Sequence, residues 1–146
     1  METQNSKLPT LAWAYGLAGL LPFVGCAAAD VAGLGPGQGA WRFALLGYSA
    51  VILSFLGGGR WGFALMSPRP SPLSMTVSMA PSIAAFFLLL TREPFLKLAL
   101  CAAAGCHGLQ WLWDVRDPGA PPGYAGLRST LTAVAVLAIL GAVALG

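Results

Sequence analysis

Five long apolar stretches constrain this chain more than any other feature of its sequence. They cover residues 8–29, 41–66, 73–90, 95–113 and 127–145, and short segments rich in Gly, Pro or polar residues separate them. At ~1.5 Å of rise per residue, a helix of such a length crosses the ~30 Å hydrocarbon core of a bilayer. The alternation of apolar and polar residues that strands require is missing. We therefore predict an all-α fold, in which residues 1–146 form a single integral membrane domain of about five transmembrane helices.

Composition supports lipid as the solvent of this domain. Only 9% of the residues are charged and 57% are hydrophobic, whereas soluble domains carry ~25% charged residues. Such a chain has too few charges to cover a water-exposed surface, but a bilayer requires no polar exterior. The net charge of +3 is spread along the sequence without a Lys/Arg cluster, so a nucleic-acid partner is not expected. Membrane lipid is the expected partner.

The first apolar stretch also has some features of a secretory signal peptide. Ala27, Ala28 and Ala29 resemble a cleavage site. However, the stretch is long and contains Pro22, and the residues before it include only one basic side chain, Lys7. We therefore expect this segment to be retained as the first span.

Two spans contain interior prolines, Pro22 in the first and Pro81 in the third. Proline lacks a backbone N–H and clashes with the preceding helical turn, so each predicts a kink. The carbonyl groups freed at a kink need other donors. On the third span, Ser74, Ser78 and Ser82 recur every four residues beside Pro81 and are candidates for this role.

Small residues recur at four-residue intervals on the second span. Ser54, Gly58 and Gly62 lie along one helix face, which Gly47 and Ala50 extend. Small side chains let another helix backbone approach closely, so this face is predicted to pack against a helix. The partner helix belongs either to the same chain or to a second copy.

Basic residues near the ends of spans predict the orientation of the chain. With the N-terminus inside, the inner loops and span ends contain Lys7, Arg60, Arg69, Arg116 and Arg128, and the outer ones contain Arg42, Arg92 and Lys97. Because inner loops carry an excess of Lys and Arg, this distribution favours an inside N-terminus and an outside C-terminus.

Several polar side chains lie within the spans, where they are costly and therefore candidates for function. Arg60 lies near the end of the second span and could reach lipid headgroups, form an ion pair or bind a ligand. In the fourth span, one helix face contains His107, Gln110, Trp111 and Asp114 and is too polar to face lipid. His107 could carry a proton, bind a quinone or a metal, or make a hydrogen bond between helices. No second histidine supports a metal site, and we predict none.

Asp114 and Arg128 lie on either side of the loop between the fourth and fifth spans. An ion pair between their side chains would hold the ends of these two helices together. We predict this pair, and expect it to matter more for stability if it is buried than if it is exposed.

An ordered series of residues resembles a known family. The series comprises Pro22-Phe23, Tyr48, the segment from Ile52 to Gly62 with Ser54 and Trp61, Pro81-Ser82, Gln110 and Asp114, and Tyr124, Leu127-Arg128 and Leu131-Thr132. It is similar to the uncharacterised membrane family, a domain of unknown function, that includes the mitochondrial transmembrane protein 69.

The resemblance implies an integral protein of a bacterial inner membrane or of mitochondria, and it implies no established activity. It directs attention to Tyr48, Ser54, Trp61, Gln110, Asp114, Tyr124 and Arg128 as candidate site residues. The short, Arg-poor segment before the first span is unlike a transit peptide. We therefore favour a bacterial inner membrane, with the mitochondrial inner membrane as the alternative.

The sequence contains none of the common catalytic motifs, neither a P-loop nor a zinc-protease or serine-hydrolase signature. No catalytic residue and no cofactor are therefore predicted. The leading hypothesis is a non-enzymatic membrane protein that binds a lipid or a quinone, or acts as an accessory or assembly factor of a larger complex. A small transporter or channel with a polar path inside the bundle is the alternative. A membrane enzyme acting on a lipid-soluble substrate is the second alternative.

Overall fold

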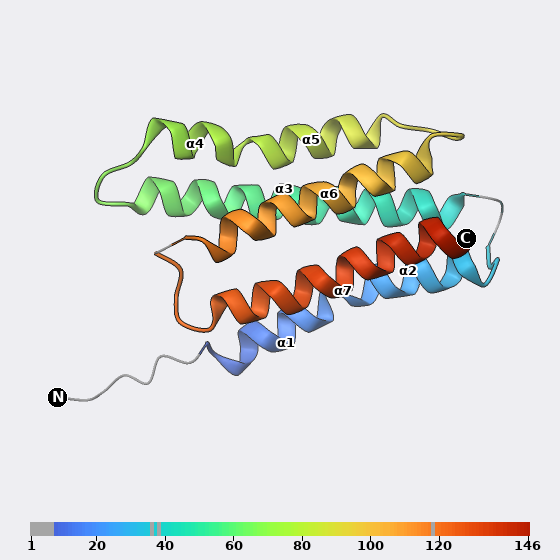
Figure 1. Cartoon of the computed structure of the whole chain (residues 1–146), viewed down its shortest axis with the longest axis horizontal. Coiled ribbons are helices and arrows are strands. Elements are labelled where there is room, and N and C mark those ends of the chain that lie inside the picture. Colours follow the sequence, from blue (N-terminus) through green and yellow to red (C-terminus); the bar gives the residue numbers. More distant parts are fainter. Residues whose placement is uncertain (1–7, 36, 38, 118) are drawn as a thin grey trace.

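The described helices form five long rods, which run roughly antiparallel to one another in the bundle shown in Figure 1. The computed structural model describes residues 8–35, 37, 39–117 and 119–146. Its helices are α1 (Thr10–Ala18), α2 (Leu21–Val31), α3 (Ala40–Met66), α4 (Pro72–Ser78), α5 (Ala80–Leu89), α6 (Leu96–Val115) and α7 (Tyr124–Leu145). Two rods each consist of two consecutive helices, α1 with α2 and α4 with α5. The all-α fold class is confirmed, and the described residues contain no strand.

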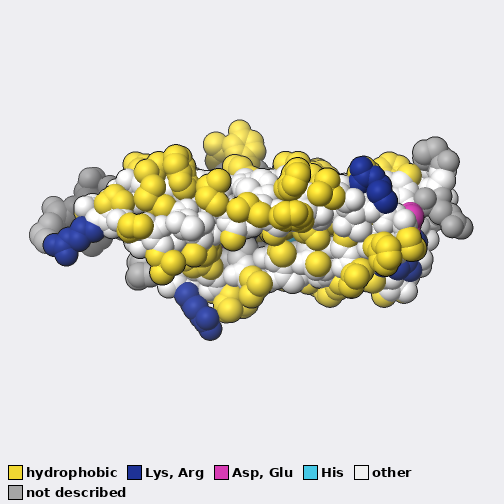
Figure 2. Space-filling model, turned by 90° about the horizontal axis from the view of Figure 1, so that it is seen from above, with side chains coloured by type: hydrophobic (Ala, Val, Ile, Leu, Met, Phe, Trp, Pro, Cys, Tyr) yellow, Lys and Arg dark blue, Asp and Glu magenta, His cyan; other side chains and the backbone are white. Residues whose placement is uncertain are grey.

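Four of the rods are long and apolar enough to cross a membrane among the residues described. They are Thr10–Val31, Ala40–Met66, Pro72–Leu89 and Tyr124–Leu145. Large apolar side chains such as Phe55, Phe87 and Leu137 point outward, and Figure 2 shows such side chains covering the middle of one face, with Lys and Arg toward its two ends. This pattern is typical of a surface that faces acyl chains.

Helix α6 is about as long as the other rods but less hydrophobic. Its His107, Gln110 and Asp114 side chains are buried among the other helices rather than exposed to the bilayer. These residues lower its mean hydropathy, while α6 itself packs between α3, α5 and α7. We therefore interpret α6 as the fifth membrane helix.

Helix α3 is the centre of the bundle, because it contacts α2, α4, α5 and α6. Leu45, Leu46 and Leu53 are fully buried along it. In contrast, α1 has no buried residue, and its principal partner is α7. The first half of the first span is thus the least firmly packed part of the bundle.

The predicted kink at Pro22 is confirmed as an interruption of the first span. Helix α1 ends at Ala18, and α2 begins at Leu21 with Pro22 in its first turn. The Tyr48 hydroxyl of α3 donates to the carbonyl oxygen of Gly19 at 2.8 Å. A side chain from a neighbouring helix therefore satisfies a carbonyl group at the break, as a bilayer environment requires.

The predicted kink at Pro81 is confirmed in the same way. Helix α4 ends at Ser78, and α5 begins at Ala80 with Pro81 in its first turn. Within the predicted serine stripe, the Ser78 hydroxyl donates to the carbonyl oxygen of Met75 at 2.7 Å. Serine thus supports the helix end locally at this break.

The closest approach of α3 to this second break occurs at Gly57. A Cβ atom at Gly57 would lie 2.7 Å from the Ser78 carbonyl oxygen and 3.3 Å from the Pro81 Cβ. In contrast, apart from the glycine itself, its two chain neighbours and the nearby backbone of α3, no atom of the described residues lies within 4 Å of a Cβ added at Gly47, Gly58 or Gly62. No other described helix therefore packs closely against these three glycines, and packing of this face against a second copy stays a prediction. Ser54, the fourth residue of the face, is half-buried.

We expect Gly57→Ala to destabilise the protein by about 1–3 kcal/mol, because the added methyl group must push the α4–α5 break away from α3. Gly58→Ala is the matched control, since it makes the same change one residue further along α3, where the space is open. Thermal unfolding of both variants in detergent measures the difference. Equal unfolding midpoints would contradict the proposed contact.

Candidate functional site

A buried carboxylate joins three helices at one end of the bundle. Asp114 of α6 is 1% exposed. Its Oδ2 accepts a hydrogen bond at 2.8 Å from the Nε of Arg128 on α7. Its Oδ1 accepts one at 3.1 Å from the amide of Gln110 and lies 3.8 Å from the Nε of Arg60 on α3. The predicted Asp114–Arg128 pair is therefore present, and Arg60 is a second cation beside the same carboxylate.

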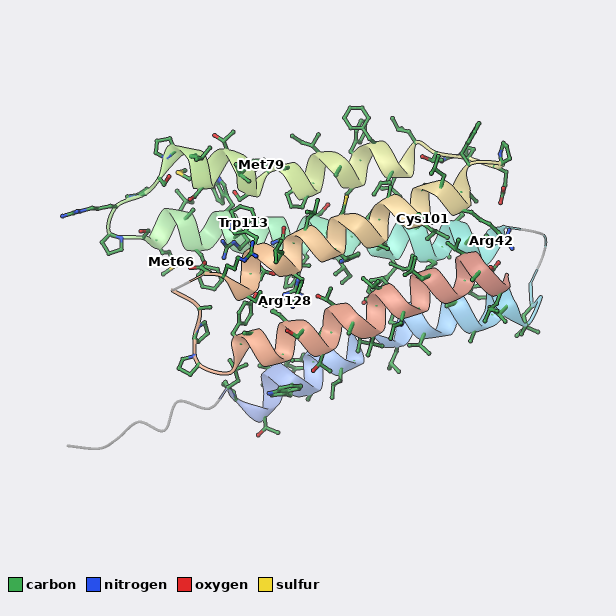
Figure 3. The ribbon with its side chains drawn as sticks, in the orientation of Figure 1. Arg42, Met66, Met79, Cys101, Trp113 and Arg128 are labelled. Carbon is green, nitrogen blue, oxygen red and sulfur yellow. The ribbon has the colours of Figure 1, made fainter. Side chains whose placement is uncertain are left out.

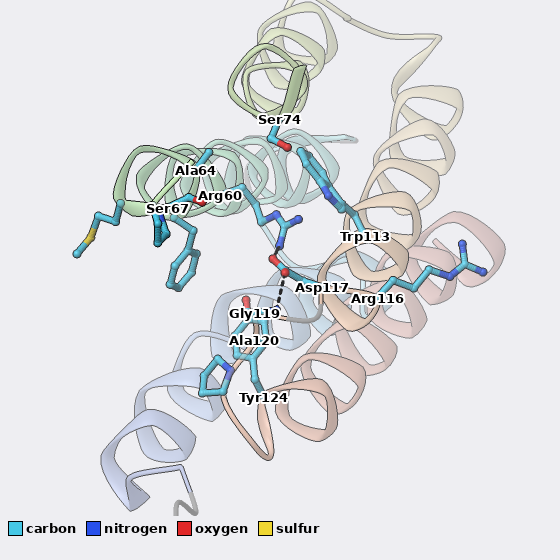
Figure 4. Close-up of a pocket in the computed structure, with 14 residues that line it drawn as sticks. Arg60, Ala64, Ser67, Ser74, Trp113, Arg116, Asp117, Gly119, Ala120 and Tyr124 are labelled. Carbon is cyan, nitrogen blue, oxygen red and sulfur yellow. Dashed lines mark hydrogen bonds and ion pairs between the residues drawn. The ribbon is translucent and has the colours of Figure 1, made fainter. Parts of the chain in front are cut away.

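Arg60 forms the outer part of this cluster. Its guanidinium group donates to the carboxylate of Asp117 and lies over the Trp113 ring, 4.3 Å from the ring centroid. Figure 4 shows Arg60 reaching Asp117 across a cavity of about 560 Å³ at this end of the bundle. Of the three roles predicted for Arg60, the ion pair is the one that the structure shows.

His107 belongs to a different set of contacts from Asp114, although both lie on the inner face of α6. Its Nε2 and the hydroxyl of Ser49 on α3 share a hydrogen bond of 2.9 Å. The Phe23 ring packs edge-on against it, 5.7 Å between centroids, and also against Tyr48. The predicted polar face of α6 is thus divided, with His107 bound to α3 through Ser49 and Gln110 bound to Asp114. Among the residues described, no three His, Cys, Asp or Glu side chains are placed to hold a metal ion.

The candidate residues predicted from the resemblance do not all converge. Tyr48 is engaged with the carbonyl of Gly19 at the break of the first span. Trp61 is exposed on the outside of α3, and Ser54 is half-buried. Tyr124, in contrast, lines both the cavity beside Arg60 and a second cavity beside Arg128.

The second cavity, of about 340 Å³, opens between α1, α3 and α7. We call it the lateral cavity. Its walls are mostly apolar, with side chains from α1, α2, α3 and α7, and His107 of α6 also contributes to the lining. Tyr15 and Phe55 line it and are largely exposed on the outer surface of the bundle, within membrane-spanning helices. The lateral cavity therefore opens on the side of the bundle, between helices that are long and apolar enough to span a membrane.

Two polar groups of the lateral cavity have no hydrogen-bond partner among the described residues. They are the Nη2 of Arg128 and the hydroxyl of Thr132, one helical turn apart on α7. Arg128 is 6% exposed and Thr132 is 8% exposed. Buried polar groups without a partner are rare and costly, so each such group calls for a specific explanation. Figure 3 shows Arg128 in the same half of the bundle as Trp113, with Arg42 at the opposite end.

Sequence reasoning did not predict Ser49 or Asp117 as site residues, and it noted Thr132 only as a member of the residue series that resembles the family. Ser49 is a polar residue in the middle of a span, and this position could have identified it as a candidate site residue. Asp117 lies in a loop, where a carboxylate is ordinary. Thr132 lies one turn after Arg128 on the same face, but a threonine in a membrane helix usually bonds its own backbone, so its position did not make it a candidate site residue.

Comparison with known sequences places the chain in a family. Residues 8–144 match the family described as "Protein of unknown function (DUF3429)". The chain belongs to this DUF3429 family. Its relatives include Transmembrane protein 69 of Xenopus tropicalis, which is 37% identical over 139 residues. The alignment covers 86% of this chain and 51% of the relative, so the chain spans about half the length of that curated protein. No solved structure matches the chain.

The DUF3429 match confirms the resemblance predicted from the residue series, and it identifies the chain as a membrane protein of a family without a known activity. The match includes both the Asp114 cluster and the lateral cavity, because it extends over all five rods.

We expect Asp114→Asn to destabilise the protein by about 3–5 kcal/mol, because it leaves the buried guanidinium of Arg128 without its charge partner. Asp117→Asn is the matched control. It also removes a carboxylate partner of Arg60, but the Asp117 side chain is 28% exposed, so the expected cost is about 0–1 kcal/mol. Unfolding midpoints of both variants in the same detergent test this. A similar midpoint for the two would contradict the role assigned to Asp114.

Proposed function

We propose that this DUF3429 protein is a non-enzymatic membrane protein that binds a lipid-soluble small molecule in the lateral cavity. The observation that supports the proposal is that two residues lining an apolar cavity, Arg128 and Thr132, each contain a buried polar atom without a partner among the described residues, Nη2 and Oγ1. Small-molecule sites are typically apolar cavities with a few polar groups that orient the ligand. A volume of about 340 Å³ falls in the usual range of such sites.

The position of the cavity defines how a ligand would enter. Leu127 and Leu131 of α7 form part of its apolar wall, and Tyr15 and Phe55 lie on its outer rim. A molecule dissolved in the bilayer would therefore reach the donors sideways, without passing through water. This route favours a lipid or quinone over a water-soluble metabolite.

The contacts of the polar residues favour binding over transport or catalysis. Gln110 and Asp114, which a transporter would use as a polar path, are engaged with each other and with arginines. Tyr48, which an enzyme would use beside Asp114 and Arg128, donates its hydroxyl to the backbone of α1–α2. These groups hold the helices in place, whereas Arg128 Nη2 and the Thr132 hydroxyl have no partner among the described residues.

In the cell, the protein would act either as an accessory or assembly factor of a larger membrane complex or as a self-associated unit. The open α3 face with Gly58 and Gly62 is where a second copy or another membrane helix would pack. We also propose a bacterial inner membrane as its location, with the mitochondrial inner membrane as the alternative.

The N-terminus is proposed to be inside and the C-terminus outside. Arg69 and Arg116 lie at the end of the bundle where α3 and α6 finish, whereas Arg42 and Arg92 lie at the other end. Lys7, the remaining basic residue outside the spans on the inner side, lies outside the described residues.

Cysteine labelling tests this orientation in a background where Cys26, Cys101 and Cys106 are replaced by alanine. We expect Ser67→Cys to be protected from a membrane-impermeant maleimide in intact cells, and Leu34→Cys to be labelled. Ser67 and Leu34 are exposed in loops at opposite ends of the bundle. The reverse labelling would contradict the positive-inside assignment.

A cavity-filling variant tests the proposed binding. Ala12 lines the lateral cavity from α1, whereas Ala14 is exposed on the same helix and does not line it. Ala12→Phe should lower the affinity for a ligand of this cavity at least tenfold, and Ala14→Phe should leave it unchanged. Since α1 has no buried residue, both variants should fold.

The measurement is quenching or shift of tryptophan fluorescence in nanodiscs during titration with three probes, namely decylubiquinone, monoolein and oleate. Binding of any one probe that Ala12→Phe weakens and Ala14→Phe does not would support the proposed function. If no probe shows this dependence on Ala12, the proposed function is wrong.

A further inference from the structure

We propose that the lateral cavity selects a neutral ligand whose head is a carbonyl oxygen, as in a quinone or a fatty-acid ester, over an anionic lipid. This inference rests on the proposed function, and concerns the chemistry of the head group that Arg128 and Thr132 receive. The inference follows from two observations, namely the polar groups that have no hydrogen-bond partner and the charges buried beside them.

The two unpartnered groups are both able to donate. Arginine has donors and no acceptor, so Arg128 Nη2 requires an acceptor from the ligand. The Thr132 hydroxyl can supply a second hydrogen bond to the same oxygen or to a neighbouring one. Because the groups are one turn apart on α7, they approach a ligand head from the same side.

The free hydroxyl of Thr132 is unusual on α7. The hydroxyl of Ser129 donates to the Ala125 carbonyl at 2.8 Å, and that of Thr130 donates to the Gly126 carbonyl at 3.1 Å. Both use the backbone oxygen four residues earlier, the ordinary solution in a membrane helix. Thr132 makes no such bond and lies in the wall of the cavity. Its buried hydroxyl therefore lacks a hydrogen bond that a ligand in the cavity would supply.

The charges near the cavity exclude an anionic ligand. Arg60 and Arg128 carry two positive charges, and Asp114 and Asp117 carry two negative charges within the same cluster of ion pairs. The cluster is thus electrically balanced before any ligand binds. A carboxylate or phosphate in the lateral cavity would add an uncompensated negative charge beside Asp114 in an environment of low dielectric constant.

A neutral carbonyl avoids that cost and accepts both hydrogen bonds. The remaining lining includes Phe23, Leu20 and Ile52, which suit an apolar ring or chain. Along α7 the lining extends from Tyr124 to Ala135, roughly 16 Å at helical rise. An elongated molecule with a carbonyl near one end fits this outline, and a quinone and an acyl ester both have that chemistry.

Titration of the intact protein in nanodiscs with decylubiquinone, monoolein and oleate at neutral pH tests the selection. We expect decylubiquinone or monoolein to bind at least tenfold more tightly than oleate. Decylubiquinone alone in that role identifies a quinone site, and monoolein alone identifies an ester-lipid site. Oleate binding as tightly as the neutral probes, with the Ala12 dependence retained, would overturn the inference and leave the proposed function standing.

Two conservative variants test whether Thr132 and Arg128 donate hydrogen bonds to the head group of the ligand. Thr132→Val removes the hydroxyl at nearly constant volume and should weaken the neutral probe about fivefold to twentyfold, whereas Thr130→Val on the outer side of α7 should have no effect. Arg128→Lys keeps a cation for Asp114 but loses the second guanidinium nitrogen, and should weaken the same probe with the folded bundle preserved. Neutral-probe affinity unchanged in both Thr132→Val and Arg128→Lys would overturn the inference.

Discussion

The packing of one half of the bundle depends on the contacts of the buried Asp114 carboxylate. Lipid tails are as apolar as the side chains that face them, so hydrophobic burial gives membrane helices little reason to associate. At the end of α6, Asp114 stabilises helix association, because it accepts a hydrogen bond from Arg128 of α7 and attracts the positive charge of Arg60 of α3. Three rods are therefore fixed relative to one another by one side chain, and the outer Asp117 balances the second arginine.

The same ion pair determines what the lateral cavity presents to the bilayer. Arg128 donates its Nε to Asp114, and its Nη2 has no hydrogen-bond partner among the described residues. The guanidinium plane is thus held by a structural contact, and Arg128 is also one of the residues that line the cavity. Stability and binding share this residue, which is why substitutions at Thr132 or Ala12 separate the two better than the removal of Arg128.

Much of the fold could be predicted from the sequence, because long apolar stretches have few alternatives in a membrane. The breaks at Pro22 and Pro81 followed from the chemistry of proline, and the Asp114–Arg128 pair followed from two opposite charges flanking one loop. The close contact at Gly57 was not predicted. The four-residue spacing of Ser54, Gly58 and Gly62 indicated a face of α3 next to the one that contains Gly57. Tertiary packing decides which face of α3 meets the α4–α5 break.

The candidate site was less predictable for the same reason. Asp117 and Ser49 become significant only through the residues opposite them, Arg60 and His107. Thr132 becomes significant only because its hydroxyl lacks the backbone bond that its neighbours Ser129 and Thr130 make. A missing hydrogen bond is a property of the packed structure, and no spacing of residues in a single sequence reveals it.

The central claim is that the lateral cavity holds a neutral, carbonyl-bearing molecule in the membrane. Native mass spectrometry of the protein extracted gently from its own membrane, as wild type and as Thr132→Val, tests this most directly. The account predicts one tightly retained quinone or ester lipid per chain in the wild type and its loss or marked depletion in the variant. Wild-type protein that retains no such molecule, or a variant that retains the same molecule equally well, would contradict the account.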